Sequence, residues 1–159
     1  MVKQAWPGTK PMSRYASPDV TPRFLLFHLH PISARLLFMR HVSGSILAPR
    51  QLPLLSSLIE EDPPEWEMAL SEQLRLGIQL NEDLGFEPGM LLVDGKFRRQ
   101  AEIPRGRVDL YLARFSTFDA PHDAVRARGG ALSPINELYG RHPVEMAVLR
   151  WAFDYLLNS

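Results

Sequence analysis

Residues 107–118, with the sequence RVDLYLARFSTF, decide the fold that we expect for this chain. Side chains alternate between the two faces of a strand, so Val108, Leu110 and Leu112 share one aliphatic face. The other face is largely aromatic and carries Asp109, Tyr111, Ala113 and Phe115. We therefore expect a central strand with its aliphatic face in the core. The aromatic face is either half-covered or used for binding.

Two turn patterns precede this strand. Leu91–Val93 is followed by Asp94 and Gly95, a dipeptide that supplies the positive φ angles of a type I′ turn. Residues 104–106 mark a second reversal, because proline and glycine occur there together. The pattern predicts an antiparallel meander whose strands cover about residues 90–93, 96–103 and 107–116.

The composition is that of an ordinary globular protein, with 45% hydrophobic and 23% charged residues among 159. This length is enough for one domain with a substantial core. The chain has no cysteine, which excludes disulfides, thiolate zinc sites and cysteine nucleophiles. No stretch approaches the ~18 apolar residues of a membrane helix, and the N-terminus lacks the apolar core of a signal peptide. We therefore expect a cytoplasmic protein that does not enter a membrane.

The net charge is zero, but the charge is unevenly distributed. Residues 1–50 carry seven basic residues and one acid, and residues 51–94 carry one basic residue and ten acids. Residues 95–159 carry ten basic residues and seven acids. Fifteen of the 18 basic residues are arginine, whose planar side chain binds carboxylate and phosphate in a bidentate manner. GC-rich codon usage is the simpler explanation of this arginine bias.

The N-terminal half of the chain begins with a predicted flexible tail, residues 1–22, which contains four prolines and no hydrophobic periodicity. A single globular domain is expected over residues 23–159. Residues 23–30 predict a buried strand that ends at a proline. Residues 33–42 have a serine start and a glycine stop, which favour a short helix, although the segment can equally form a strand paired with the first.

Four further segments are predicted to be helical. Residues 52–60 form a short helix, and a longer one begins at Asp62 and Pro63, where Glu65 completes a capping box. That longer helix contains Gly77, which suggests close packing, and stops at a glycine in position 85. The remaining two helices cover residues 121–128 and 143–157.

The last of these helices is apolar on nearly all sides, which predicts burial or contact with a second subunit. With residues 131–132 as an edge strand, the pattern predicts an α+β domain. It should contain a mostly antiparallel sheet of about four or five strands, packed by three or four helices.

Two histidines form the first candidate site. His28 and His30 project from one face of the predicted strand, about 6.6 Å apart, and two imidazoles so placed can bind one metal ion or take part in acid–base catalysis. More often such a pair is structural. The possible sources of a third metal ligand are His41, Asp94, Asp109 and His122.

A second polar group follows the central strand. Asp119, His122 and Asp123 lie in a loop at the end of that strand, where catalytic sites are common. The two aspartates also make sense as caps of the next helix. We therefore keep Asp119 and His122 as catalytic candidates beside His28 and His30.

The predicted hairpin before the central strand is basic. Its cationic side chains surround one phenylalanine and comprise Lys96, Arg98, Arg99, Arg105 and Arg107. Such clusters bind nucleic-acid phosphates, but the neutral overall charge and the neighbouring acids argue for a solvated surface. The binding surface that we predict consists of Lys96, Arg98, Arg107, Tyr111 and Phe115. The competing explanation is that a helix covers Tyr111 and Phe115.

No phosphate-binding loop and no nucleophile elbow occur in the sequence, and no motif points to a particular cofactor. The leading hypothesis is a non-enzymatic accessory or assembly factor that binds a protein partner or forms a homo-oligomer. The first alternative is a small metal-dependent or acid–base hydrolase that uses His28 and His30. The second is nucleic-acid binding through the basic hairpin at residues 96–107.

Overall fold

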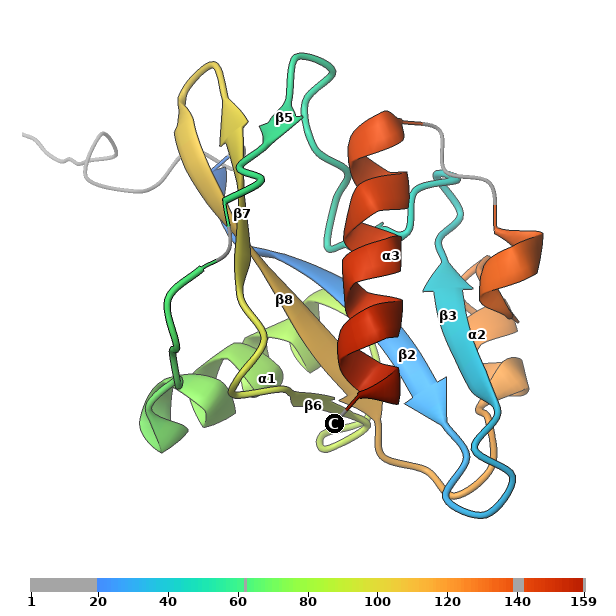
Figure 1. The fold of residues 1–159 in the computed structure, drawn as a ribbon. Coiled ribbons are helices and arrows are strands. Elements are labelled where there is room, and N and C mark those ends of the chain that lie inside the picture. The colour runs from blue at the N-terminus through green and yellow to red at the C-terminus, as the bar shows by residue number, and fades with distance from the viewer. Residues whose placement is uncertain (1–19, 62, 139–141, 159) are drawn as a thin grey trace, which may run out of the picture.

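One sheet of eight strands organises the part of the chain that the structure, a computed structural model, describes: residues 20–61, 63–138 and 142–158 (Figure 1). The strands are β2 (Arg23–Leu29), β3 (Leu36–Arg40), β4 (Leu47–Ala48), β5 (Ser57–Leu58), β6 (Leu91–Val93), β7 (Arg99–Ile103), β8 (Gly106–Phe115) and β9 (Ala131–Ser133). The helices are α1 (Leu70–Leu84), α2 (His122–Arg126), the 3-10 helix η3 (Ile135–Glu137) and α3 (Pro143–Leu157). The predicted α+β class is confirmed. Most of the predicted tail, residues 1–19, lies outside the described residues.

The strand order is β5-β7-β8-β2-β3-β9, with β4 also beside β2 and β6 also beside β8. Every pairing is antiparallel except that of β2 with β8, which is parallel. The predicted strand count was therefore too low. The predicted meander contained only strands that follow one another in the sequence, so it did not include the parallel pairing of β2 with β8 at the centre of the sheet. Both central strands are apolar on their two faces, as strands covered by helices on both sides must be.

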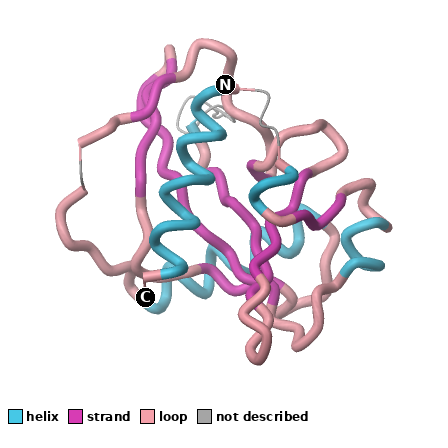
Figure 2. Tube along the Cα trace, turned by 45° about the vertical axis from the view of Figure 1, so that its right-hand side comes forward, coloured by secondary structure: helices cyan, strands magenta, loops and turns pink. Residues whose placement is uncertain are grey.

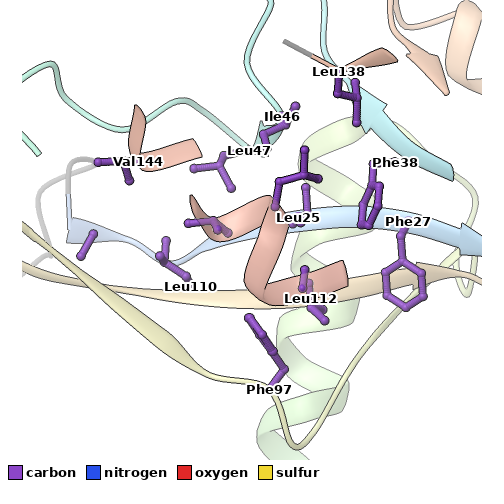
Figure 3. Close-up of a cluster of buried hydrophobic side chains, with 14 of the residues drawn as sticks. Leu25, Phe27, Phe38, Ile46, Leu47, Phe97, Leu110, Leu112, Leu138 and Val144 are labelled. Carbon is purple, nitrogen blue, oxygen red and sulfur yellow. The ribbon is translucent and has the colours of Figure 1, made fainter. Parts of the chain in front are cut away.

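The aliphatic face of β8 lies in the core, as predicted. Val108, Leu110 and Leu112 are buried in one cluster with Phe97 and with β2, β3 and the inner side of α3 (Figure 3). Ala101 and Ile103 of β7 belong to the same cluster. The predicted alternation along β8 is thus confirmed.

A second apolar cluster fills the opposite face of the sheet. It joins β8, through Tyr111 and Phe115, to Leu76 and Leu80 of α1 and to Val125 of α2. Figures 1 and 2 show the consequence, with α3 in front of the sheet and α1 and α2 behind it. Both faces of the sheet are therefore covered.

Two predicted helices are wrong. Residues 33–42 contain strand β3, and Phe27 pairs with Phe38 across the β2–β3 hairpin, which was the alternative interpretation. As a strand paired with β2, the segment buries four consecutive apolar residues, Leu36 to Met39. A surface helix would expose some of these four side chains, because they point in different directions around the helix axis. Residues 52–60 contain β5 instead of a helix, with Ser57 opposite Glu102 of β7.

The long helix starts later than predicted. α1 begins at Leu70 and ends, as expected, at Gly85 in the left-handed conformation with φ 73°. Residues 63–68 are neither helix nor strand. Within this segment, Trp66 stacks on Tyr111 of β8, and the N–H of Met68 donates to the carbonyl of Gly95 at 2.7 Å. Asp62, the predicted cap, lies outside the described residues. The final helix spans the predicted residues, and His142 caps its first turn.

The hairpin predicted at Asp94 and Gly95 is also wrong. Strands β6 and β7 do not pair with each other within the described sheet; both run antiparallel to β8, one after the other. Gly95 lacks the positive φ of a type I′ turn. The Asp94 carboxylate accepts the N–H groups of Lys96 and Phe97 at 2.8 and 2.9 Å. The chain therefore interrupts its pairing with β8 at this turn and then continues in the same direction, without reversing.

Candidate binding site at the arginine pocket

A pocket of about 290 Å³ lies where the chain between β5 and α1 crosses strands β7 and β8. Three of its lining side chains are cationic, and one is acidic. Its lining residues are Ile59, Glu61, Pro63, Pro64, Trp66, Arg98, Arg99, Gln100 and Arg107. We call this the arginine pocket.

Stacked aromatic rings support the pocket. Trp66 and Tyr111 are nearly parallel, with 14° between the ring planes and 5.8 Å between their centroids. The guanidinium carbon of Arg98 lies 5.4 Å from the Trp66 centroid, a cation–π distance. Burial, followed by the nearby Asp109 carboxylate, raises the pKa of Tyr111 to about 12. The phenol therefore stays protonated and donates a hydrogen bond at neutral pH.

Asp109 holds three of these side chains in place. Its Oδ1 accepts from Arg98 Nε at 3.2 Å and from Gln100 Nε2 at 2.9 Å. Its Oδ2 accepts from the Tyr111 hydroxyl at 3.2 Å. One carboxylate on the outer face of β8 thus fixes the orientation of Arg98 beside the Trp66 ring.

The side chains of the other two arginines of the pocket differ in the contacts that they make. Arg99 lies over the ring of Trp151, with its guanidinium carbon 3.5 Å from the centroid, and so connects the pocket to α3. Arg107 is exposed, and its side chain makes no hydrogen bond or ion pair with the described residues. Arg107 is therefore the cation of the pocket that a ligand can take up without displacing a described partner.

The predicted binding residues divide into two groups. The structure brings Arg98, Arg107 and Tyr111 together around the arginine pocket, but Lys96 is not among its lining residues. Phe115 is fully buried against Phe86, with 5.5 Å between ring centroids. Of the two explanations offered for this aromatic pair, exposure is wrong and cover is correct. The α1 side of the core covers Phe115, whereas Tyr111 is covered by Trp66, which lies outside the helix.

Sequence reasoning missed Trp66, Gln100 and Asp109 as parts of this site. Trp66 falls within the span of the predicted long helix, which the structure begins only at Leu70. The alternation along the central strand put Asp109 on the same face as Tyr111, and this was the one available sign of their contact.

His28 and His30, two of the four predicted catalytic residues, lie together but make structural contacts. His28 is 1% exposed, and its Nε2 lies 2.9 Å and 3.1 Å from the carbonyls of Thr117 and Phe118. His30 Nδ1 accepts the N–H groups of two residues in the β2–β3 turn, each at 3.2 Å. Its Nε2 donates to Asp119 at 3.4 Å. These contacts orient the turn and the loop after β8.

The candidate third ligands do not converge on the histidine pair. Asp94 accepts from the Tyr155 hydroxyl, and Asp109 belongs to the arginine pocket. Within residues 20–61, 63–138 and 142–158, no three His, Asp or Glu side chains are grouped so that they can hold a metal ion. The metal and catalytic roles therefore gain no support from the described geometry.

Neither a protein-family model nor a curated protein matches this chain. None of the described helices combines the length and the apolarity needed to cross a membrane. The inference of function therefore starts from the geometry of the described residues.

Proposed function

We propose that this protein is a non-enzymatic accessory or assembly factor that binds an acidic segment of a partner protein in the arginine pocket. The observation that carries the proposal is the convergence of Arg98, Arg99 and Arg107 on one hollow of about 290 Å³. Such a volume suits one or two side chains of a peptide, since whole small-molecule sites usually begin near 300 Å³.

The pocket offers different chemistry at its centre and its edge. Arg107 has a planar guanidinium that can form a bidentate pair with a carboxylate. Arg98 is already oriented by Asp109 and Trp66, so binding costs little of its rotamer freedom. Pro63 and Pro64 provide an apolar rim, against which the aliphatic parts of a peptide can pack.

An acidic peptide suits the pocket better than nucleic acid does. Glu61 lines the pocket and Asp109 already pairs with Arg98, so the local positive charge is small for binding a run of phosphates. One face of Trp66 is stacked on Tyr111 and cannot receive a base. The hydrolase alternative is weaker still, because both ring nitrogens of His30 are engaged.

The proposal is tested by fluorescence anisotropy with a labelled peptide of about 12 residues that is rich in glutamate and apolar residues. Arg107→Ala should weaken binding about tenfold or more, as expected for loss of a bidentate charged pair. Arg114→Ala is the matched control. It removes an exposed arginine from the same strand but from the opposite face, so binding should not change.

A labelled oligothymidylate of about the same length forms the second arm of the experiment. Tighter binding of the oligonucleotide, lost on Arg107→Ala, would assign the pocket to nucleic acid and overturn the proposal. Equal losses on Arg107→Ala and Arg114→Ala would show only general charge attraction, and would overturn it as well.

A further inference from the structure

A histidine closes the turn between β2 and β3, at the end of the sheet where the loop after β8 also lies (Figure 1). The Nδ1 atom of His30 accepts the N–H groups of Ile32 and Ser33, each at 3.2 Å. A ring nitrogen accepts only while it carries no proton, because its lone pair forms the bond. We assign the proton of the neutral ring to Nε2, which lies 3.4 Å from a carboxylate oxygen of Asp119. The turn as observed therefore requires a neutral His30.

The same turn holds one residue in an unfavourable backbone conformation. Ala34 has φ 59°, in the left-handed region that residues with a Cβ rarely adopt. Such a conformation persists only where surrounding contacts hold it. These contacts include the bond from the N–H of Ala34 to the His30 carbonyl at 2.9 Å and the two N–H groups held by Nδ1. Loss of the Nδ1 acceptor should therefore loosen the turn.

Protonation of His30 removes that acceptor. The lone pair of Nδ1 is replaced by an N–H group that points at two other N–H groups, so two attractive contacts become repulsive. The compensating gain is an ion pair between the imidazolium and Asp119, whose side chain is 87% exposed. Exposed ion pairs contribute little to stability. The balance of these contacts favours opening of the turn.

The other charged or titratable groups beside the ring do not change this balance. His28 of β2 lies 6.3 Å away between ring centroids. Arg35 belongs to the same turn, where its carbonyl accepts the N–H of His30 at 3.0 Å and its side chain is exposed. Neither side chain hydrogen-bonds to the His30 ring, and neither provides a negative charge that would hold the protonated ring in place.

His28 makes contacts of the opposite kind. Its Nε2 lies 2.9 and 3.1 Å from the carbonyls of Thr117 and Phe118, so it can only donate to them. A protonated ring also carries a hydrogen on Nε2, and these two contacts therefore do not depend on the charge of His28. Phe118 also packs against the His30 ring, with 4.9 Å between centroids. The loop after β8 should thus stay attached to β2 when the turn opens.

We propose that His30 is a pH-sensitive latch, which keeps the β2–β3 turn closed while its ring is neutral and releases the turn when the ring is protonated. Histidine is the side chain whose charge ordinarily changes between about pH 5 and 8. The change is local to residues 31–34, where Ile32 is 79% exposed. This turn shares no residue with the arginine pocket, so the failure of either proposal leaves the other intact.

The test is NMR spectroscopy of the full chain, labelled with ¹⁵N, between about pH 8 and 5. The ring nitrogens of His30 report its protonation, and the backbone order parameters of Ile32 and Ser33 report the turn. These order parameters should fall from about 0.85, which is typical of rigid backbone, to about 0.6 or less. The fall should have the same midpoint as the titration of the His30 ring.

Two variants separate the latch from other effects of pH. His30→Asn keeps an acceptor oxygen at the start of the turn but cannot be protonated, so its order parameters should not change with pH. Asp119→Asn removes the carboxylate that favours the protonated ring. In this second variant, the midpoints of the ring titration and of the turn opening should move together to lower pH.

Four results would overturn the proposal. The first is an unchanged order of Ile32 and Ser33 while the wild-type His30 ring titrates. The second is a His30→Asn turn that loosens with pH as the wild-type turn does, which would assign the effect to another group. The third is an Asp119→Asn ring midpoint that moves without the opening midpoint. The fourth is a His30 ring that stays neutral down to the pH at which the protein unfolds.

Discussion

Gly130 and Gly77 are both surrounded by protein, yet they differ in what a side chain would meet. A Cβ at Gly130 would lie 2.7 Å from the carbonyl oxygen of Arg40 and 2.7 Å from the Met39 methyl. A Cβ at Gly77 would meet the Leu91 carbonyl at 3.8 Å and Val93 at 3.9 Å, which are ordinary contacts. Glycine is thus required at the first position only.

This difference gives a paired prediction at the residue scale. Gly130→Ala should destabilise the fold by about 1 to 3 kcal/mol, because the β3 backbone must move. Gly77→Ala should leave stability unchanged or raise it by up to about 1 kcal/mol, because alanine favours the helix. Urea unfolding at neutral pH measures both values. A destabilisation of Gly77→Ala equal to that of Gly130→Ala would contradict the geometry.

Buried polar side chains in this protein mostly satisfy backbone or hydroxyl groups. Glu145 of α3 accepts from the Ser45 hydroxyl at 2.6 Å and from the N–H of Ile46 at 3.2 Å, and so attaches the last helix to the chain before β4. Arg128 donates to the carbonyls of Leu84 and Gly85, where cationic groups favour a helix C-terminus. These two polar side chains therefore help to fix the positions of α3 and α1.

At the scale of elements, α1 and β6 depend on Asn81. Its side chain satisfies both backbone groups of Leu91 and also donates to the Gly77 carbonyl at 2.9 Å. Asn81→Ala should cost about 2 to 4 kcal/mol, because buried backbone groups lose their partners. Amide exchange at Leu91 should accelerate as well.

The control for Asn81 is Gln79→Ala, on the exposed side of the same helix, where the glutamine donates only to Asp83. It should change stability by less than about 0.5 kcal/mol. If both variants lost the same stability, the effect would come from helix propensity and the amide contacts of Asn81 would be unimportant.

The elements that the sequence predicts correctly are those with local causes. The alternation in β8, the glycine stop of α1 and the span of α3 follow from periodicity and capping. The errors arise where contacts between residues far apart in the sequence determine the secondary structure. Trp66 stacks on Tyr111, 45 residues later in the chain, and lies outside α1. Strand β6 pairs with β8, where Phe115 and Ala113 lie opposite it.

The candidate site shows the same limit. Arg98, Arg107 and Tyr111 could be selected from the sequence because β7 and β8 are adjacent in the chain. The covering residues come from the segment between β5 and α1, and nothing local indicates that this segment crosses the sheet. Leu70 and Leu74 show a further limit, because both lie within the predicted helix but nothing local indicates that they face away from the core.

At the scale of the whole molecule, the uneven charge of the sequence corresponds to two different surfaces. The acidic block at residues 51–94 includes Glu72, Glu82 and Asp83, which are exposed on α1, whereas Arg98, Arg99 and Arg107 line the arginine pocket. Binding of an acidic segment in that pocket should therefore weaken as ionic strength rises.

The stability of the whole molecule should depend on pH in two separate ranges. Burial lowers the pKa of His41 from 6.5 to about 4. The unfolded chain therefore binds a proton that the folded chain does not, and stability is lost as pH falls from about 6.5 towards 4. Burial raises the pKa of Tyr155 and Tyr111 from 10 to about 12. Their contribution is present below pH 10 and is lost between about 10 and 12.

Equilibrium unfolding in urea between pH 4 and 8 tests the acidic range. His41 lines two neighbouring hollows, and burial is the cause of its lowered pKa. His41→Gln, which cannot be protonated, should lose less stability than the wild type between pH 6.5 and 4, by on the order of 1 to 3 kcal/mol. His122→Gln, at the exposed start of α2, is the control and should follow the wild type. Parallel profiles for the wild type and His41→Gln would mean that carboxylates alone cause the acid limb, and that His41 is protonated without cost in the folded protein.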